Sequence, residues 1–281
     1  MLKQRIITAL VLLLLLLPAL VASQPVFFDA LTLVFIAAGA WEWARLNGYT
    51  GATPLLTGLM CCLICLGMWG ANWPDMHLPQ LWLFTGAAWV LLSAYVLSRG
   101  VESWQTYARP LRWLLGVAGL CLTWLAVAQA KRVGVNFLVS VLTLVWMADI
   151  AAYFAGRTWG GRLIRRKLAA SISPGKSWEG VMGGIVGVVG LSFAWRYADQ
   201  ALGATVPSLY THLEGRGTGA LLLACLFLTV MSVVGDLIES LVKRSAGVKD
   251  SSALLPGHGG VLDRVDALLP TVPLVMMLYA L

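Results

Sequence analysis

Long apolar runs alternate with short polar connections along the whole chain. A helix that crosses a membrane needs about 20 mostly apolar residues, and by that rule the sequence predicts about nine such helices. They cover residues 5–22, 26–46, 54–71, 80–98, 111–130, 135–156, 179–198, 218–244 and 264–281. The pattern therefore predicts an all-α polytopic membrane protein.

The basic residues of the connections predict an orientation. If the N-terminus is cytoplasmic, all but four of the 20 lysines and arginines fall in cytoplasmic segments. The four exceptions are Lys131, Arg132, Arg196 and Arg216. Since lysine and arginine accumulate on the cytoplasmic side of membrane proteins, we expect a cytoplasmic N-terminus and a periplasmic C-terminus.

The first apolar run has some features of a signal peptide. Lys3 and Arg5 precede a leucine run that ends at Pro18, and small residues follow. A second long apolar run begins almost at once. We therefore expect the first run to be a retained membrane span.

Composition agrees with the membrane assignment. The chain of 281 residues is 59% hydrophobic and 12% charged, and its mean hydropathy of +0.81 excludes an ordinary soluble protein. The net charge of +7 lies in short segments between apolar runs. That distribution favours membrane orientation over nucleic-acid binding.

The five cysteines all lie within apolar stretches. Cys61, Cys62 and Cys65 have a metal-like spacing, but no second Cys or His pair lies nearby in the sequence. We interpret them, together with Cys121 and Cys225, as small apolar residues of the spans.

The two halves of the chain differ in charge. Residues 1–130 read as a scaffold of about five helices, in which Asp29 and Glu42 lie near helix ends. Residues 131–281 read as a catalytic region of about four helices with cytoplasmic loops 157–179 and 245–263.

Asp149 lies inside an apolar run, where an isolated carboxylate is costly. We expect it to face an aqueous cavity, the alternative being a buried structural hydrogen bond.

Residues 173–180, SPGKSWEG, suggest a phosphate site. A glycine-containing turn with Lys176 and Ser177 before a helix start can present N–H groups and an ammonium to a phosphate. A P-loop is rejected, because it needs glycine where Ala170 stands. The helix that follows carries five glycines, which predict close packing against a neighbour. They are Gly180, Gly183, Gly184, Gly187 and Gly190.

The most highly charged stretch of the chain is 235–266. Asp236, Ser240 and Lys243 recur at helical spacing and share one face. An alternative role for Lys243 is an i, i+4 pair with Glu239. Hard carboxylate oxygens without clustered histidines suit Mg²⁺, and nearby lysines and arginines suit polyphosphate. The residues thus predict phosphoryl or nucleotidyl transfer at a membrane surface.

At this point the stretch resembles the phosphatidate cytidylyltransferases, or CDP-diacylglycerol synthases. The positions that fill the long family signature without a gap are Ser240, Lys243, Arg244, Lys249, Asp250, Ser252, Leu255, Pro256, His258, Gly259, Gly260, Val261, Asp263, Arg264, Val265 and Asp266. The likeness extends to Asp149, Ala152, Tyr153, Gly156, Arg157 and residues 173–180, although the family often has Lys where Gly175 stands and Thr where Ser177 stands.

The resemblance implies that CTP and phosphatidic acid give CDP-diacylglycerol and pyrophosphate at a bacterial inner membrane, with the site facing the cytoplasm. It implies catalytic roles for Asp236, Ser240, Lys243 and Asp263, with Asp236 and Asp263 holding Mg²⁺ in a one- or two-cation centre. The implied substrate-binding residues are Asp149, Lys176, Ser177, Glu179, Arg244, Lys249, Asp250, His258, Gly259, Gly260, Arg264 and Asp266. The partners are CTP, phosphatidic acid and membrane lipid but not nucleic acid, and a homodimer is left open.

Two other functions are compatible with parts of this pattern. A CTP-dependent lipid kinase of the dolichol kinase type has a similar charged region but releases CDP instead of pyrophosphate. A secondary transporter would use Asp149, Asp236 and Glu239 as coupling residues. No repeat relates the two halves, and transport leaves the segment 258–266 unexplained.

Overall fold

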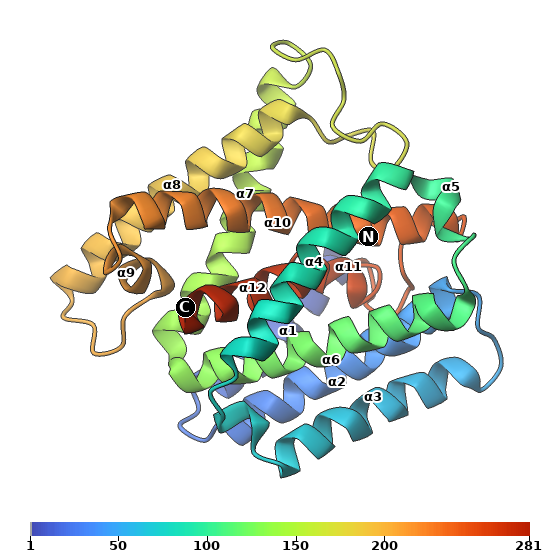
Figure 1. Cartoon of the computed structure of the whole chain (residues 1–281), viewed down its shortest axis with the longest axis horizontal. Coiled ribbons are helices and arrows are strands. Elements are labelled where there is room, and N and C mark those ends of the chain that lie inside the picture. The colour runs from blue at the N-terminus through green and yellow to red at the C-terminus, as the bar shows by residue number, and fades with distance from the viewer. Residues whose placement is uncertain (1) are drawn as a thin grey trace.

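The computed structural model describes residues 2–281; Met1 and the side chains of Leu2, Lys3 and Arg5 lie outside the described residues. The described part is helical and contains no strand (Figure 1). Its helices are α1 (Leu2–Val21), α2 (Pro25–Leu46), α3 (Thr53–Gly70), the 3₁₀ helix η1 (Trp73–Asp75), α4 (Pro79–Arg99), α5 (Val101–Trp104), α6 (Arg109–Val133), α7 (Val135–Trp159), α8 (Trp178–Ala201), α9 (Leu209–Glu214), α10 (Thr218–Ser245), α11 (Leu262–Val265) and α12 (Leu268–Ala280).

The all-helical prediction is confirmed, and the first eight predicted ranges each match one long helix within a few residues. Seven helices within residues 2–281 are long and apolar enough to cross a membrane: α2, α3, α4, α6, α7, α8 and α10. The apolar part of α1 is the shorter segment Ile6–Val21. The count of nine spans therefore stays a prediction.

The predicted helix 264–281 is wrong as one continuous element. It is divided into the short α11 and the 13-residue α12. Pro270 has no N–H to donate to the carbonyl of Asp266, which instead accepts a hydrogen bond from the N–H of Leu269 at 3.3 Å. At 1.5 Å per residue, α12 is about 20 Å long, shorter than a bilayer core.

The short helix α12 lies at the centre of the helix packing. It contacts α4, α6 and α10, and the side chains from Leu269 to Met276 are buried. Helices α2, α3 and α6 pack together on one side of it, while α7 and α8 form a long hairpin that packs against α10 (Figure 1). The centre of the fold thus directly follows the charged segment 258–266.

The glycines of α8 pack against α7, as the sequence predicts. A Cβ on Gly184 would stand 3.0 Å from the carbonyl oxygen of Ala148, and one on Gly183 or Gly187 would overlap an alanine of α7. Gly190 faces open space. Close approach of α7 and α8 therefore depends on the glycines before residue 190.

Contacts between connecting segments gather them at two ends of the helix bundle. At one end, hydrogen bonds join Trp104 to Asn47, Gln105 to Ser245 and Arg244 to Ile172. At the other end, they join Lys131 to Ala22, Arg132 to Asp75, Asn136 to Val206 and Arg216 to Leu278. Consecutive long helices therefore run from one end to the other and back.

Candidate active site

The last turns of α10 present the polar face expected from the sequence. Ser240 donates a hydrogen bond to Asp236 Oδ1 at 3.2 Å, and Lys243 lies one turn further along. The Asp236 side chain keeps 31% of its surface exposed. This face is thus half-open, although the helix belongs to the apolar core.

The 160–177 loop meets this face through Lys176. The Lys176 ammonium lies 2.5 Å from Asp236 Oδ2. These residues are 60 positions apart, and sequence reasoning had assigned both to phosphate or metal binding. The fold therefore brings two separately predicted segments into one site.

Ser177 and Glu179 hold this loop in place. The hydroxyl of Ser177 caps α8 by accepting the N–H of Gly180 at 3.1 Å. Glu179 Oε1 accepts the backbone N–H groups of Gly161, Leu163 and Ile164 at 2.9 to 3.1 Å. Both side chains point into the protein's own backbone, so they position Lys176.

Lys243 lies between two carboxylates. Its Nζ is 2.5 Å from Asp263 Oδ1 and 2.5 Å from Glu239 Oε2. The i, i+4 pair with Glu239 and the contact with the signature segment, which the sequence left as alternatives, are thus both present. All three side chains are at least 89% buried, so each charge depends on the others for compensation.

Asp263 fastens the turn that precedes it. Its Oδ2 accepts the N–H groups of Ser251 and Gly260 at 2.9 and 2.7 Å, and the Ser251 hydroxyl at 3.0 Å. Burial acts to raise the pKa of Asp263, but the hydrogen bonds from Lys243, Gly260 and Ser251 outweigh it and hold the pKa below its usual value. Asp263 is therefore ionised at neutral pH.

The two glycines of the turn are required by space and backbone angle. Gly259 has a φ of +83°, which only glycine adopts readily. A Cβ on Gly260 would overlap the Ser251 hydroxyl and the Glu42 carboxylate. The glycines thus let the turn close around two acidic side chains.

Sequence reasoning missed Glu42, which is fully buried on α2. Its carboxylate accepts hydrogen bonds from the Ser251 and Ser252 hydroxyls at 3.1 and 2.5 Å. It also accepts the N–H groups of Val261 and Leu262 at 2.9 and 2.7 Å. Glu42 thus fixes both ends of the 251–262 segment. The available signal was a carboxylate in an apolar helix, the same signal that singled out Asp149.

The remaining predicted residues lie around this turn. Arg264 donates two hydrogen bonds to the carbonyl oxygen of His258 at 3.0 and 2.6 Å. Arg244 reaches the carbonyl of Ile172 at 3.4 Å and so links the two loops. Lys249 and Asp250 are exposed in the same segment. The His258 imidazole has its buried Nδ1 without a hydrogen-bond partner among the described residues.

Carboxylates concentrate beside Lys176. Asp149, Asp236 and Asp266 lie within electrostatic range of one another. Lys176 is the nearby cation that offsets them. The structure thus places two further carboxylates close to Asp236, one of the two residues that the sequence predicts to hold a cation.

A second group of candidate metal ligands is a cysteine cluster. The Sγ atoms of Cys61, Cys65 and Cys121 lie within 4.8 Å of one another, and all three residues are buried. In the part of the chain that the structure describes, no other group of three or more His, Cys, Asp or Glu residues has its ligand atoms within this distance of one another. It lies between α3 and α6, and Cys62 does not belong to it.

The geometry of the charged cluster suits a polyphosphate ligand. Lys176, Arg244 and Arg264 are cations on its open side, while the carboxylate group of Asp149, Asp236 and Asp266 suits a divalent cation that would accompany such a ligand. Two loops, both fixed by buried glutamates, contribute to this cluster.

Comparison with known proteins shows the family of the chain. A sequence profile described as the cytidylyltransferase family matches residues 3–281. The chain is 38% identical over 287 residues to the phosphatidate cytidylyltransferase of Pseudomonas aeruginosa, covering 97% of this chain and 95% of that one. It is 36% identical over 305 residues to that of Haemophilus influenzae, covering 99% of each. The chain therefore belongs to the cytidylyltransferase family.

Proposed function

We propose that the chain is a nucleotidyltransferase that makes CDP-diacylglycerol and pyrophosphate from CTP and phosphatidic acid. The observation that carries this is the meeting of Lys176 with Asp236, which joins two predicted phosphate-binding segments into one site. The printed names of the two near full-length relatives support the choice of substrates.

The reaction needs charge neutralisation and alignment more than covalent catalysis. A phosphatidate oxygen attacks the α-phosphorus of CTP in line, and the bond from that phosphorus to the oxygen bridging to the β-phosphate breaks. Pyrophosphate leaves with that bond's electrons, and no enzyme-bound intermediate forms. The candidate groups that neutralise the phosphates are Lys176, Lys243, Arg244, Lys249 and Arg264, with Ser240 as a hydrogen-bond donor.

The acidic group fits Mg²⁺. Asp236 and Asp263 are the ligands expected from the sequence, and the position of Asp266 close to Asp236 adds that residue to the candidates. When bound, the ion neutralises phosphate oxygens. Asp263 has Lys243 and three donors of the 251–260 turn as partners. Among the described residues, Asp236 has only Ser240 and Lys176, and Asp266 accepts the N–H of Ala267, so these two carboxylates have fewer partners to lose on binding an ion.

The site would face the cytoplasm of a bacterial inner membrane. The end of the bundle that carries it includes the 246–261 loop and the 160–177 loop, and the latter alone holds five lysines and arginines. With α1 and the α11–α12 pair each counted as a crossing, nine passes place the N-terminus inside and the C-terminus outside.

The test is product analysis in membranes containing the chain. We expect labelled CTP and phosphatidic acid to yield CDP-lipid and pyrophosphate; release of CDP with a phosphorylated lipid would instead indicate a kinase.

We expect Asp236→Asn to lower kcat by roughly 10²- to 10³-fold, as loss of one charge-stabilising group does. The matched control is Glu102→Gln, which changes an exposed carboxylate on α5. Normal turnover and unchanged Mg²⁺ dependence in Asp236→Asn would remove Asp236 from the site.

A further inference from the structure

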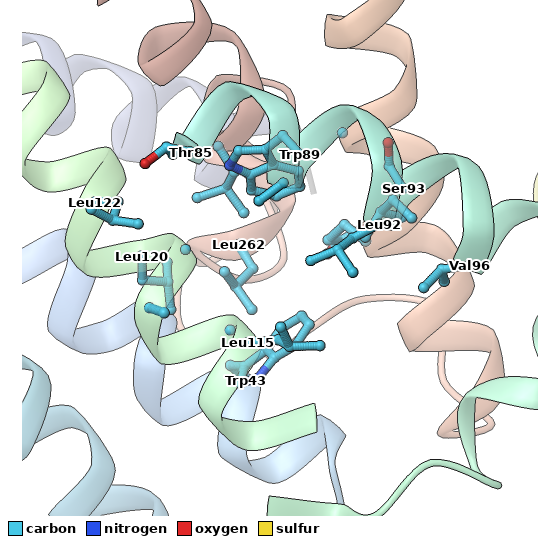
Figure 2. Close-up of a pocket in the computed structure, with 18 of the residues that line it drawn as sticks. Trp43, Thr85, Trp89, Leu92, Ser93, Val96, Leu115, Leu120, Leu122 and Leu262 are labelled. Carbon is cyan, nitrogen blue, oxygen red and sulfur yellow. The ribbon is translucent and has the colours of Figure 1, made fainter. Parts of the chain in front are cut away.

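An apolar cavity of about 180 Å³ opens between α4 and α6. Trp89 and Leu92 from α4, Leu115 and Leu120 from α6 and Trp43 from α2 face this shared space (Figure 2). Helix α4 packs on α10 and α12, and α6 packs on α2 and α12. The cavity is thus a gap between two helices that are held together through α12.

The inner wall of the cavity belongs to the helix that carries the candidate active site. It includes Gly235, Ile238 and Glu239 of α10. Glu239 Oε2 lies 2.5 Å from Lys243 Nζ, which itself lies 2.5 Å from Asp263 Oδ1. The apolar wall is therefore continuous with the buried ion pairs of the site, and Glu239 marks the boundary between them.

The surroundings of the cavity are apolar on both sides of its opening. Helices α4 and α6 are each long and apolar enough to cross a membrane, so hydrocarbon surrounds them in place of water. Leu92 at the opening is 44% exposed. A cavity with so few polar groups is poorly suited to hold ordered water.

A ligand that fits both regions carries phosphate at one end and hydrocarbon at the other. We propose that this cavity is the binding site for one acyl chain of the phosphatidic acid substrate. The inference rests on the proposed function. It adds a lipid subsite formed by α4 and α6, helices that were expected to be scaffold.

Small residues at the wall keep the space open. Ala88 and Ala118 line the cavity and are exposed, and a Cβ on Gly119 would make only an ordinary 3.6 Å contact with Trp89. Larger side chains at these positions would fill the cavity without displacing buried backbone. Ala87, the exposed neighbour of Ala88, does not line it and provides a matched control.

The first test uses the unsubstituted chain, so it depends on no variant folding. Phosphatidic acid with a diazirine in one acyl chain is photolysed with the protein in membranes, and the labelled peptides are mapped. We expect labelling concentrated on α4 and α6 at residues 88–96 and 115–122, and reduced by excess unlabelled dioleoyl phosphatidic acid. Labelling spread evenly over the lipid-facing surfaces of α3 and α8 would indicate bulk lipid only and overturn the proposal.

The second test fills the cavity. We expect Ala88→Leu to raise the KM for dioleoyl phosphatidic acid roughly tenfold, the scale of a few misplaced methylenes in a pocket, and to leave the KM for CTP unchanged. Ala87→Leu should change neither. If Ala88→Leu does not fold, Ala118→Leu on α6 tests the same space. An unchanged lipid KM in the folded variant contradicts the acyl site.

The two proposals fail separately. If the unsubstituted chain forms no CDP-lipid, the proposed function fails whatever the labelling shows. If it forms CDP-lipid, but the labelling is not concentrated on α4 and α6 and the lipid KM of the folded Ala88→Leu variant is unchanged, only the acyl site fails.

Discussion

At the scale of single residues, Glu42 shows how a distant carboxylate organises the signature segment. Its four hydrogen bonds span more than 200 positions of sequence. A buried carboxylate with this many donors stabilises one loop conformation, because each donor left unpaired costs about 1–3 kcal/mol. Glu42 touches the loop and is thus a positioning residue.

We predict that Glu42→Gln lowers kcat by roughly 10²-fold, the loss expected when catalytic groups shift by about 1 Å. The amide would place N–H groups against backbone N–H groups of Val261 or Leu262, so the loop must move. Hydrogen exchange should accelerate at residues 251–262 alone. A general loss of stability would instead accelerate exchange throughout the protein. Glu102→Gln serves as the control. Unaltered exchange in this segment would show that Glu42 does not hold it.

Spacing along the chain was enough to predict which candidate residues lie together on one helix, and their roles stay predictions. Asp236, Ser240 and Lys243 share a face because helical geometry dictates it, and Asp263 follows a glycine turn. Glu42 was missed because its partners lie on other elements, and no local period reveals a contact between α2 and residue 261. Glu179 was expected to bind substrate, but its carboxylate oxygen Oε1 accepts three backbone N–H groups.

At the scale of elements, Gly235 controls how closely α10 approaches the segment after α11. A Cβ there would stand 2.5 Å from the carbonyl oxygen of Asp266 and 2.8 Å from Pro270. Asp236 follows Gly235 directly, so the spacing of the acidic group depends on this contact.

We predict that Gly235→Ala destabilises the protein by about 1–3 kcal/mol, the usual range for overpacking, and reduces activity with it. Gly219→Ala is the matched control on the same helix, because nothing lies within 4 Å of its Cβ position and alanine favours helix. Thermal unfolding in detergent and CDP-lipid formation measure the two effects. Equal unfolding temperatures for the two variants would contradict the close contact.

Helix boundaries were predictable because apolar runs end sharply at polar or proline residues. The break at Asp266 was not predictable, because the pattern from 264 to 281 stays apolar and typical of one helix. The cause is Pro270, which has no N–H to donate to the Asp266 carbonyl, and a hydropathy pattern does not register a single lost hydrogen bond. Helix α12, which follows the break, contacts α4, α6 and α10.

At the scale of the whole molecule, contacts between loops sort the connections into two ends. The 160–177 loop, the end of α10 and the 47–52 and 100–108 links share one end. The segment from 202 to 217 belongs to the other. This grouping agrees with alternate crossing, and from it the positive-inside rule predicts that the first end is cytoplasmic.

We predict that a cysteine at Lys167 reacts in intact cells only with a membrane-permeable maleimide, whereas one at Thr205 also reacts with an impermeant maleimide. Both positions are exposed. Background should be low, since Cys61, Cys65, Cys121 and Cys225 are buried and Cys62 is half-buried within α3. The unsubstituted chain measures that background directly. Labelling of Lys167→Cys by the impermeant reagent would reverse the orientation. The charged cluster would then face away from cytoplasmic CTP, so the same experiment decides whether the site is open to its proposed nucleotide.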